Sequence, residues 1–93
     1  SGYVCWVYNQ NGYDVGRTTA NGLWQKSQHI SEAEAKPGDL VFFKGTYDTP
    51  GMSHTGIYLG NGMMVSAGDP IKYANIHSSY WQKYLSGFGR LSK

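Results

Sequence analysis

The clearest pattern in the chain is a set of short apolar runs separated by turns rich in glycine and asparagine. Residues 39–43 follow a Pro-Gly turn and contain four consecutive apolar residues, which predicts a buried strand. Residues 55–59 and 63–67 are also rich in apolar and β-branched side chains, and the Gly-Asn-Gly sequence between them predicts a hairpin. We therefore expect an antiparallel sheet in the second half of the chain.

The first part of the chain favours helices. Residues 1–10 place Val4, Cys5 and Tyr8 around a helix that ends at an Asn-Gly stop signal, and residues 17–25 predict a short helix with a threonine N-cap. Residues 30–35 are expected to be a polar linker, 44–52 a loop, 68–70 a turn, 71–73 a short extended piece, 79–85 a helical turn and 88–91 a final strand. This order predicts one α+β domain, with an N-terminal helix packed on an antiparallel sheet.

Composition excludes several classes of function. The 93 residues are 40% hydrophobic, enough for one small folded domain, and contain no apolar run of the roughly 20 residues that a transmembrane helix needs. The net charge of +2 is small and dispersed, so we expect no binding of nucleic acid. One cysteine and three histidines without ligand spacing predict neither an intramolecular disulfide nor a metal site, and we expect no cofactor.

His54 is the candidate general base. It stands at the start of an apolar strand, and an imidazole with an ordinary pKa of about 6.5 can accept and return a proton near neutral pH. A lone histidine in such a place is usually just a hydrogen-bonded polar residue. Cys5 is a poor nucleophile candidate, because it sits a full turn inside the expected helix, where a thiol packs as a small hydrophobe. His29 and His77, in polar surroundings, are expected to be solvated.

Three sequence blocks occur in a specific order: Ser-Gly-Tyr-Val at residues 1–4, Pro-Gly-Asp-Leu-Val-Phe-Phe at 37–43, and Ser-His-Thr-Gly-Ile-Tyr at 53–58. The first resembles the tail of an Asp-Cys-Ser-Gly-aromatic-Val signature, and the others resemble the next two blocks of the NlpC-type peptidoglycan endopeptidases. The match continues to the closing residues 87–91. The resemblance implies a papain-like core and cysteine-peptidase chemistry.

The chain departs from the family pattern at its start. The family nucleophile is a cysteine immediately before the serine that matches Ser1, and here Ser1 is the first residue. A chain boundary, a homologue without activity or a modified cysteine would each explain this, and we expect the chain to be the C-terminal part of a larger catalytic domain. A cysteine before Ser1 would open the first helix, where the helix dipole favours the thiolate. The amino end of Ser1 should then lie within a few ångströms of the His54 ring.

The resemblance also implies the remaining catalytic role. With His54 as the base, the family places a polar orienting residue on the next strand, at the position of Ser66. Serine is not the commonest choice there, and it could equally be an ordinary strand residue. Asp69 and His77 are the less expected substitutes. A residue in this role accepts a hydrogen bond from the imidazole and so fixes its tautomer.

Two further residues are candidates for substrate binding. Arg17 matches a family position in a Pro-Arg-Thr-like block, although Gly16 replaces the proline, and its guanidinium could pair with a substrate carboxylate or form a structural salt bridge. Ser53 stands next to the base and could contact substrate. Aromatic residues could wall a groove, although core packing would explain most of them: Trp24, Tyr47, Tyr80 and Trp81.

The resemblance implies a monomeric enzyme that cleaves peptidoglycan stem peptides, most often between γ-D-glutamate and the diamino acid, and that is secreted or attached to a bacterial cell wall. Two rivals are an N-acetylmuramoyl-L-alanine amidase with the same Cys-His chemistry and a non-catalytic wall-binding module. Product masses would separate the two enzymes. An all-β fold without a helix opposite His54 would favour the module.

Overall fold

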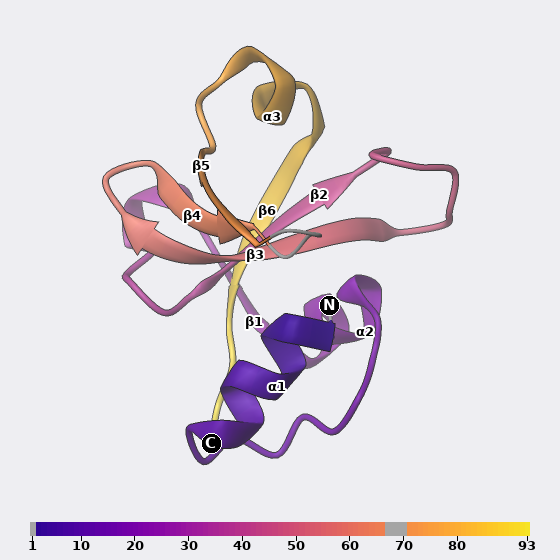
Figure 1. The fold of residues 1–93 in the computed structure, drawn as a ribbon, viewed down its shortest axis with the longest axis vertical. Coiled ribbons are helices and arrows are strands. Elements are labelled where there is room, and N and C mark those ends of the chain that lie inside the picture. The colour runs from indigo at the N-terminus through magenta and orange to yellow at the C-terminus, as the bar shows by residue number, and fades with distance from the viewer. Residues whose placement is uncertain (1, 67–70) are drawn as a thin grey trace.

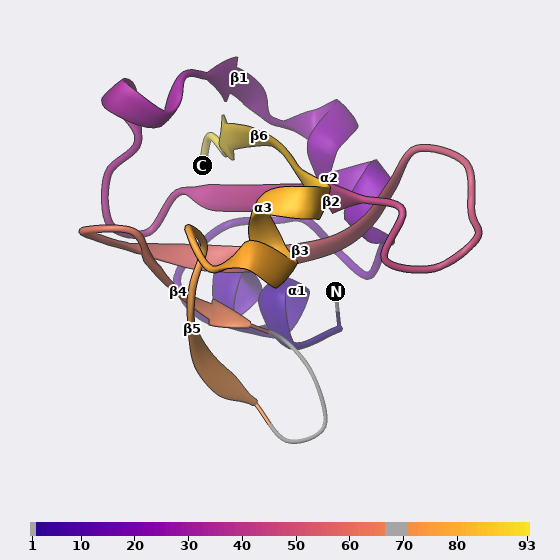
Figure 2. The same cartoon turned by 90° about the horizontal axis from the view of Figure 1, so that it is seen from above.

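A computed structural model describes residues 2–66 and 71–93 of the chain. Its strands form one antiparallel sheet in the order β1-β6-β2-β3-β4-β5. The strands are β1 (Gln28–Ile30), β2 (Leu40–Lys44), β3 (Met52–Gly60), β4 (Met63–Ser66), β5 (Lys72–Asn75) and β6 (Leu85–Arg90). Helices α1 (Gly2–Gln10) and α2 (Ala20–Lys26) cover one face, and α3 (Ser79–Tyr84) covers the other (Figures 1 and 2). The predicted α+β class is confirmed.

Strand β2 is buried on both faces, which explains its unbroken apolar sequence. Successive side chains of a strand point to opposite sides of the sheet. Leu40 and Phe42 therefore join the core beneath α1 and α2, while Val41 and Phe43 join the core beneath α3, and all four are fully buried. The sheet is thus the middle layer between two separate cores.

Helix α1 contributes Val4, Cys5 and Tyr8 to the first core. Cys5 is 1% exposed, and its thiol donates a hydrogen bond of 3.6 Å to the carbonyl of Thr18. The predicted burial of Cys5 inside the helix is confirmed. The predicted threonine cap of α2 is also present, because the side chain of Thr19 accepts a hydrogen bond from the backbone N–H of Gly22.

The prediction of a polar linker over residues 30–35 was wrong. Strand β1 pairs with β6, with His29 opposite Gly89, and a 3₁₀ helix, η1 (Glu32–Glu34), follows it. A capping box between Ser31 and Glu34 stabilises η1. Strand β1 is largely exposed at the edge of the sheet, so its sequence carries little hydrophobic signal.

Two other strands begin earlier than predicted. Strand β3 begins at Met52, which pairs with Lys44, so His54 lies inside the strand. Strand β6 begins at Leu85, three residues before the predicted start. The predicted end of β4 at residue 67 and the turn at 68–70 fall outside the described residues.

An ion pair joins the end of the sheet to the start of β2. The guanidinium of Arg90 donates hydrogen bonds of 3.0 and 2.8 Å to the two carboxylate oxygens of buried Asp39. Burial alone would raise the pKa of Asp39, but the bonds from Arg90 and from the Lys36 N–H outweigh it and hold the pKa below its usual value. No helix within the described ranges is long and apolar enough to span a membrane.

Candidate active site

His54 lies in the opening residues of β3, directly opposite Phe43 of β2. The pairing of β3 with β4 ends at Gly56 and Ser66, so His54 lies two residues beyond the last described pair on that side. Helix α1 contacts β3, and in both ribbon views its first turn lies near the earlier half of that strand (Figures 1 and 2). The half-buried imidazole is therefore held by a central strand of the sheet.

The structure brings His54 and Ser66 together. Nε2 of His54 and Oγ of Ser66 are 2.9 Å apart. Ser66 is diagonal to His54 across the strand pair, an arrangement that side chains on one face can span. When the hydroxyl accepts the Nε2 proton of neutral imidazole, the lone pair of the ring is on Nδ1, where it can take a proton from another group.

Gly56 allows the two strands to approach this closely. A Cβ atom at Gly56 would lie 2.7 Å from Sδ of Met64 and 2.9 Å from the carbonyl oxygen of Val65. The second of these atoms belongs to the backbone of β4 and cannot move without shifting the strand. A side chain at this position would therefore displace β4 and with it the hydroxyl of Ser66.

Two aromatic rings enclose the imidazole on the α3 side of the sheet. The ring centroids of His54 and Trp81 are 5.2 Å apart with 21° between the ring planes, and Phe43 lies 5.8 Å from His54. Burial lowers the pKa of His54 below its ordinary value of about 6.5. The ring is consequently neutral at neutral pH, as a general base must be. No local sequence pattern indicates the Trp81 contact, because it depends on how the chain returns through α3.

Ser53 has a buried hydroxyl that is used within the protein. Its Oγ accepts a hydrogen bond of 3.0 Å from the Thr46 N–H, lies 2.6 Å from the Thr46 hydroxyl, and donates to the carbonyl of Phe43. These bonds hold the loop before β3. Ser53 also lines a hollow of about 290 Å³ together with Asn21 and Tyr47, so substrate contact at this place stays a prediction.

Arg17 lies on the exposed segment before α2. It lines a hollow of about 330 Å³ next to the first turns of α1, together with Gly2, Cys5 and Trp6. Within residues 2–66 and 71–93 Arg17 forms no ion pair. Its predicted role as a partner of a substrate carboxylate is untested.

The remaining candidates have other surroundings. Ser1 and Asp69 lie outside the described residues, so the predicted approach of Ser1 to His54 is untested. Nε2 of His77 is 2.9 Å from a carboxylate oxygen of Glu32, and its Nδ1 is 3.3 Å from the side-chain amide of Gln82, so both ring nitrogens are engaged away from His54.

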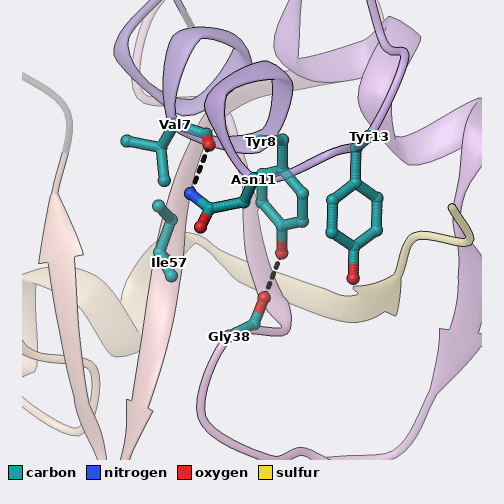
Figure 3. Close-up of a pocket in the computed structure, with 6 residues that line it drawn as sticks. All are labelled: Val7, Tyr8, Asn11, Tyr13, Gly38 and Ile57. Carbon is teal, nitrogen blue, oxygen red and sulfur yellow. Dashed lines mark hydrogen bonds between the residues drawn. The ribbon is translucent and has the colours of Figure 1, made fainter.

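A separate hollow of about 170 Å³ lies at the far end of α1 (Figure 3). Val7, Asn11, Tyr13 and Ile57 give it a mainly apolar lining. The Tyr8 hydroxyl donates to the carbonyl of Gly38 at its edge, and burial raises the pKa of this phenol. This hollow lies at the opposite end of α1 from Gly2.

No group of three or more potential metal ligands occurs in the part of the chain that the structure describes. The polar groups around His54 are hydroxyls and ring nitrogens, which suit proton transfer. The arrangement of a half-buried imidazole, a hydroxyl on the adjacent strand and a nearby helix start is typical of the base side of a cysteine-peptidase site.

Comparison with known proteins decides the family. The model of the NlpC/P60 family matches residues 1–90. The chain belongs to the NlpC/P60 family.

Two similar relatives come from bacteria. The chain is 50% identical over 92 residues to "Probable endopeptidase p60" of Listeria monocytogenes, and 44% identical over 92 residues to "Bifunctional muramidase/DL-endopeptidase CwlT" of Bacillus subtilis. These alignments cover 98% of this chain but only 18% and 28% of the two relatives. The chain thus spans less than a third of the length of these relatives.

Solved structures of NlpC/P60 proteins share the fold. A lipoprotein-like member from Staphylococcus aureus superposes with a TM-score of 0.94 at 39% identity, covering 100% of this chain and 32% of that one. RipD of Mycobacterium tuberculosis, described as a non-catalytic domain protein adapted to peptidoglycan binding, superposes with a TM-score of 0.71 at 21% identity, covering 94% and 61%. The first likeness supports the family membership, and the second shows the fold alone.

Proposed function

We propose that this NlpC/P60 chain carries the base side of a peptidoglycan endopeptidase, which cleaves stem peptides between γ-D-glutamate and the diamino acid. The observation that supports this most is the 2.9 Å contact of His54 with Ser66, beside the start of α1. The names of the p60 and CwlT relatives support the endopeptidase class. The nucleophile is a cysteine directly before Ser1, as in the family signature that residues 1–4 resemble.

The reaction proceeds through an acyl-enzyme. His54 first takes the proton of the cysteine thiol, and the resulting thiolate attacks the carbonyl carbon of the stem-peptide bond. Protonated His54 then gives this proton to the leaving amine, which leaves a thioester. His54 then takes a proton from water, the hydroxide attacks the thioester carbon, and the thiol leaves with a carboxylate product formed. Ser66 keeps Nε2 occupied throughout, so that Nδ1 remains the atom that exchanges protons with nucleophile and substrate.

The enzyme is a secreted or wall-attached bacterial protein in this proposal, and it works as a monomer on the stem peptide. Arg17, exposed beside the first turns of α1, pairs with a carboxylate of the substrate. Ser53 lies next to His54 and shapes the path of the substrate to it, because its hydroxyl holds the loop that follows β2. The role of Arg17 follows the family position that it matches, and that of Ser53 follows its place next to His54.

Product masses test the proposal. The intact protein, including the residues that precede Ser1, is incubated with purified disaccharide-peptide fragments of peptidoglycan. An endopeptidase leaves a disaccharide with a dipeptide and releases a peptide that begins with the diamino acid. An amidase instead yields a free disaccharide and a complete stem peptide. These products would contradict the proposed endopeptidase and support the amidase.

Thiol chemistry provides the matched control. Alkylation of the upstream cysteine should abolish product formation, whereas Cys5→Ala should keep most of the activity because Cys5 is buried and hydrogen-bonded to Thr18. Loss of activity in folded Cys5→Ala would make Cys5 the nucleophile. A protein that pellets with intact cell walls but yields no product would be a wall-binding module, the function that the RipD description gives for that protein.

A further inference from the structure

Among the described residues, the imidazole of His54 has one hydrogen bond, to Ser66, and a single bond does not fix the orientation of the ring. The side chain ends in a torsion between an sp³ and an sp² carbon, which has a broad energy profile. The bond from Nε2 to Ser66 fixes one edge of the ring but leaves the ring plane free to tilt about that contact. A general base must be held within about 10–20° of its productive orientation.

Trp81 supplies the missing restraint on the ring plane. Its indole faces the imidazole with 21° between the planes and 5.2 Å between the centroids. Trp81 is itself held by Phe43, with 4.7 Å between the ring centroids. The exposed ring of Tyr80 also contacts the indole, at 4.9 Å with the rings nearly perpendicular. The indole therefore has a fixed place in the second core and does not depend on His54 for its orientation.

We infer that Trp81 is a positioning residue of the active site, which holds the plane of the His54 ring so that its free nitrogen points at the nucleophile. This inference rests on the proposed function for its catalytic consequence. Its geometric part stands on the contacts among Trp81, Phe43 and His54 alone.

The placement of Trp81 on α3 gives this role a physical basis. Helix α3 covers the face of the sheet opposite α1 (Figures 1 and 2), so the base is held from one face of the sheet while the helix that opens with the nucleophile packs on the other. Among the contacts described for His54, the side chains of Phe43, Ser66 and Trp81 carry no charge. Trp81 also shields one face of the ring from water, and this burial keeps the pKa of His54 low.

Three variants of α3 in the intact protein test the inference. Trp81→Leu keeps an apolar side chain but removes the flat ring, Trp81→Phe keeps a ring, and Tyr80→Leu removes a neighbouring ring that contacts Trp81. We expect Trp81→Leu to lower kcat about 10- to 100-fold with little change in KM, because a misplaced base impairs the chemical steps more than binding. Trp81→Phe should recover most of kcat, and Tyr80→Leu should stay within about threefold of the wild type.

A titration provides a readout that does not need catalysis. In protein labelled with ¹³C at the histidine Cε1 position, Trp81→Leu should raise the pKa of His54 toward 6.5 and shift its resonance, because the ring current and the shielding from water are both lost. An unchanged His54 titration in Trp81→Leu, or equal losses of kcat in Tyr80→Leu and Trp81→Leu, would overturn the inference. If the wild type releases no product while the titration shifts as expected, the proposed function fails and the positioning contact stands.

Discussion

The chain contains two histidines that stack on tryptophans, and they differ in almost everything else. The ring centroids of His29 and Trp24 are 3.4 Å apart, with 9° between the ring planes. This stack is closer and more nearly parallel than that of His54 and Trp81. However, His29 is exposed on edge strand β1, and its Nε2 donates to the backbone carbonyl of Trp24. Stacking on an indole therefore does not by itself distinguish a catalytic histidine.

The position of each pair in the sheet makes the difference. His54 lies on a central strand, is half-buried, and shares a hydrogen bond with a side-chain hydroxyl of the adjacent strand. The His29 bond returns to the same short segment of chain, so it stabilises the connection from α2 to β1 and nothing beyond it. Burial and a partner from another strand are the features that suit His54 to the proton transfer proposed for it.

Alanine substitution of each histidine should give the largest contrast. In the intact protein, His54→Ala should lower turnover of peptidoglycan fragments by about a thousandfold or more, since both acylation and deacylation pass a proton through this ring. His29→Ala should stay within about twofold, because an exposed edge residue contacts no part of the site. Product release measured by mass spectrometry checks both. Similar losses in the two variants would remove the distinction between the pairs.

Ser66→Ala should have a smaller effect on the same assay. The hydroxyl orients the ring but forms no bond to substrate, and water can replace part of the hydrogen bond, so we expect a loss of about 10- to 100-fold in kcat. Ser66→Thr keeps a hydroxyl and should retain more activity than Ser66→Ala. A complete loss equal to that of His54→Ala would make Ser66 as essential as the base, and no loss would assign the orientation of His54 to another residue.

Substitution of Trp24 should lower the stability of the fold, whereas substitution of Trp81 should change the properties of His54. The ring of Trp24 packs at 5.1 Å from Phe42 and fills the space over Gly87, where a Cβ atom would lie 2.8 Å from the indole. Trp24→Leu should therefore lower the free energy of unfolding by about 1–3 kcal/mol, as expected for loss of a large, partly buried ring. The His54 titration should not change. Urea unfolding and the labelled histidine spectrum measure the two effects separately, and a shifted His54 pKa in this variant would couple the two tryptophans.

The parts of the fold that sequence could predict are those with a strong local signal. The unbroken apolar run of β2, the Asn-Gly turn between β3 and β4 and the cap at Thr19 each depend on neighbouring residues, and each is present. Strand β1 was missed because its pairing with β6 joins residues near opposite ends of the chain, and an exposed edge needs no apolar pattern. The capping box at Ser31 and Glu34 did carry a local signal, the Ser-x-x-Glu spacing.

The residues of the candidate site also differ in how far the sequence alone could indicate them. His54 stood out from its setting on an apolar strand, and the resemblance to the family placed Ser66 beside it, which agrees with the 2.9 Å contact. Trp81 could not be assigned, because its stack with His54 depends on how α3 folds back over β2 and β3. The use of the Ser53 hydroxyl by Thr46 likewise depends on a loop conformation that no sequence spacing specifies.

The smallest expected effect is a pH dependence of stability that belongs to His54. Burial lowers the pKa of His54 in the folded protein, whereas in the unfolded chain it titrates near 6.5. As the pH falls through about 6.5, the unfolded state therefore binds a proton that the folded state does not, and stability declines until the pH passes below the folded pKa.

A matched variant isolates this contribution from that of the other histidines. His54→Gln cannot titrate in this range, while His29 and His77 remain unchanged in both proteins, and the Asp39 carboxylate loses its stabilising contribution only at much lower pH. Urea unfolding between pH 5 and 8 should show a steeper decline in stability toward acid for the wild type than for His54→Gln. Parallel curves would mean that the folded protein leaves the pKa of His54 unshifted, and the burial that sets His54 apart from His29 would then have no electrostatic consequence.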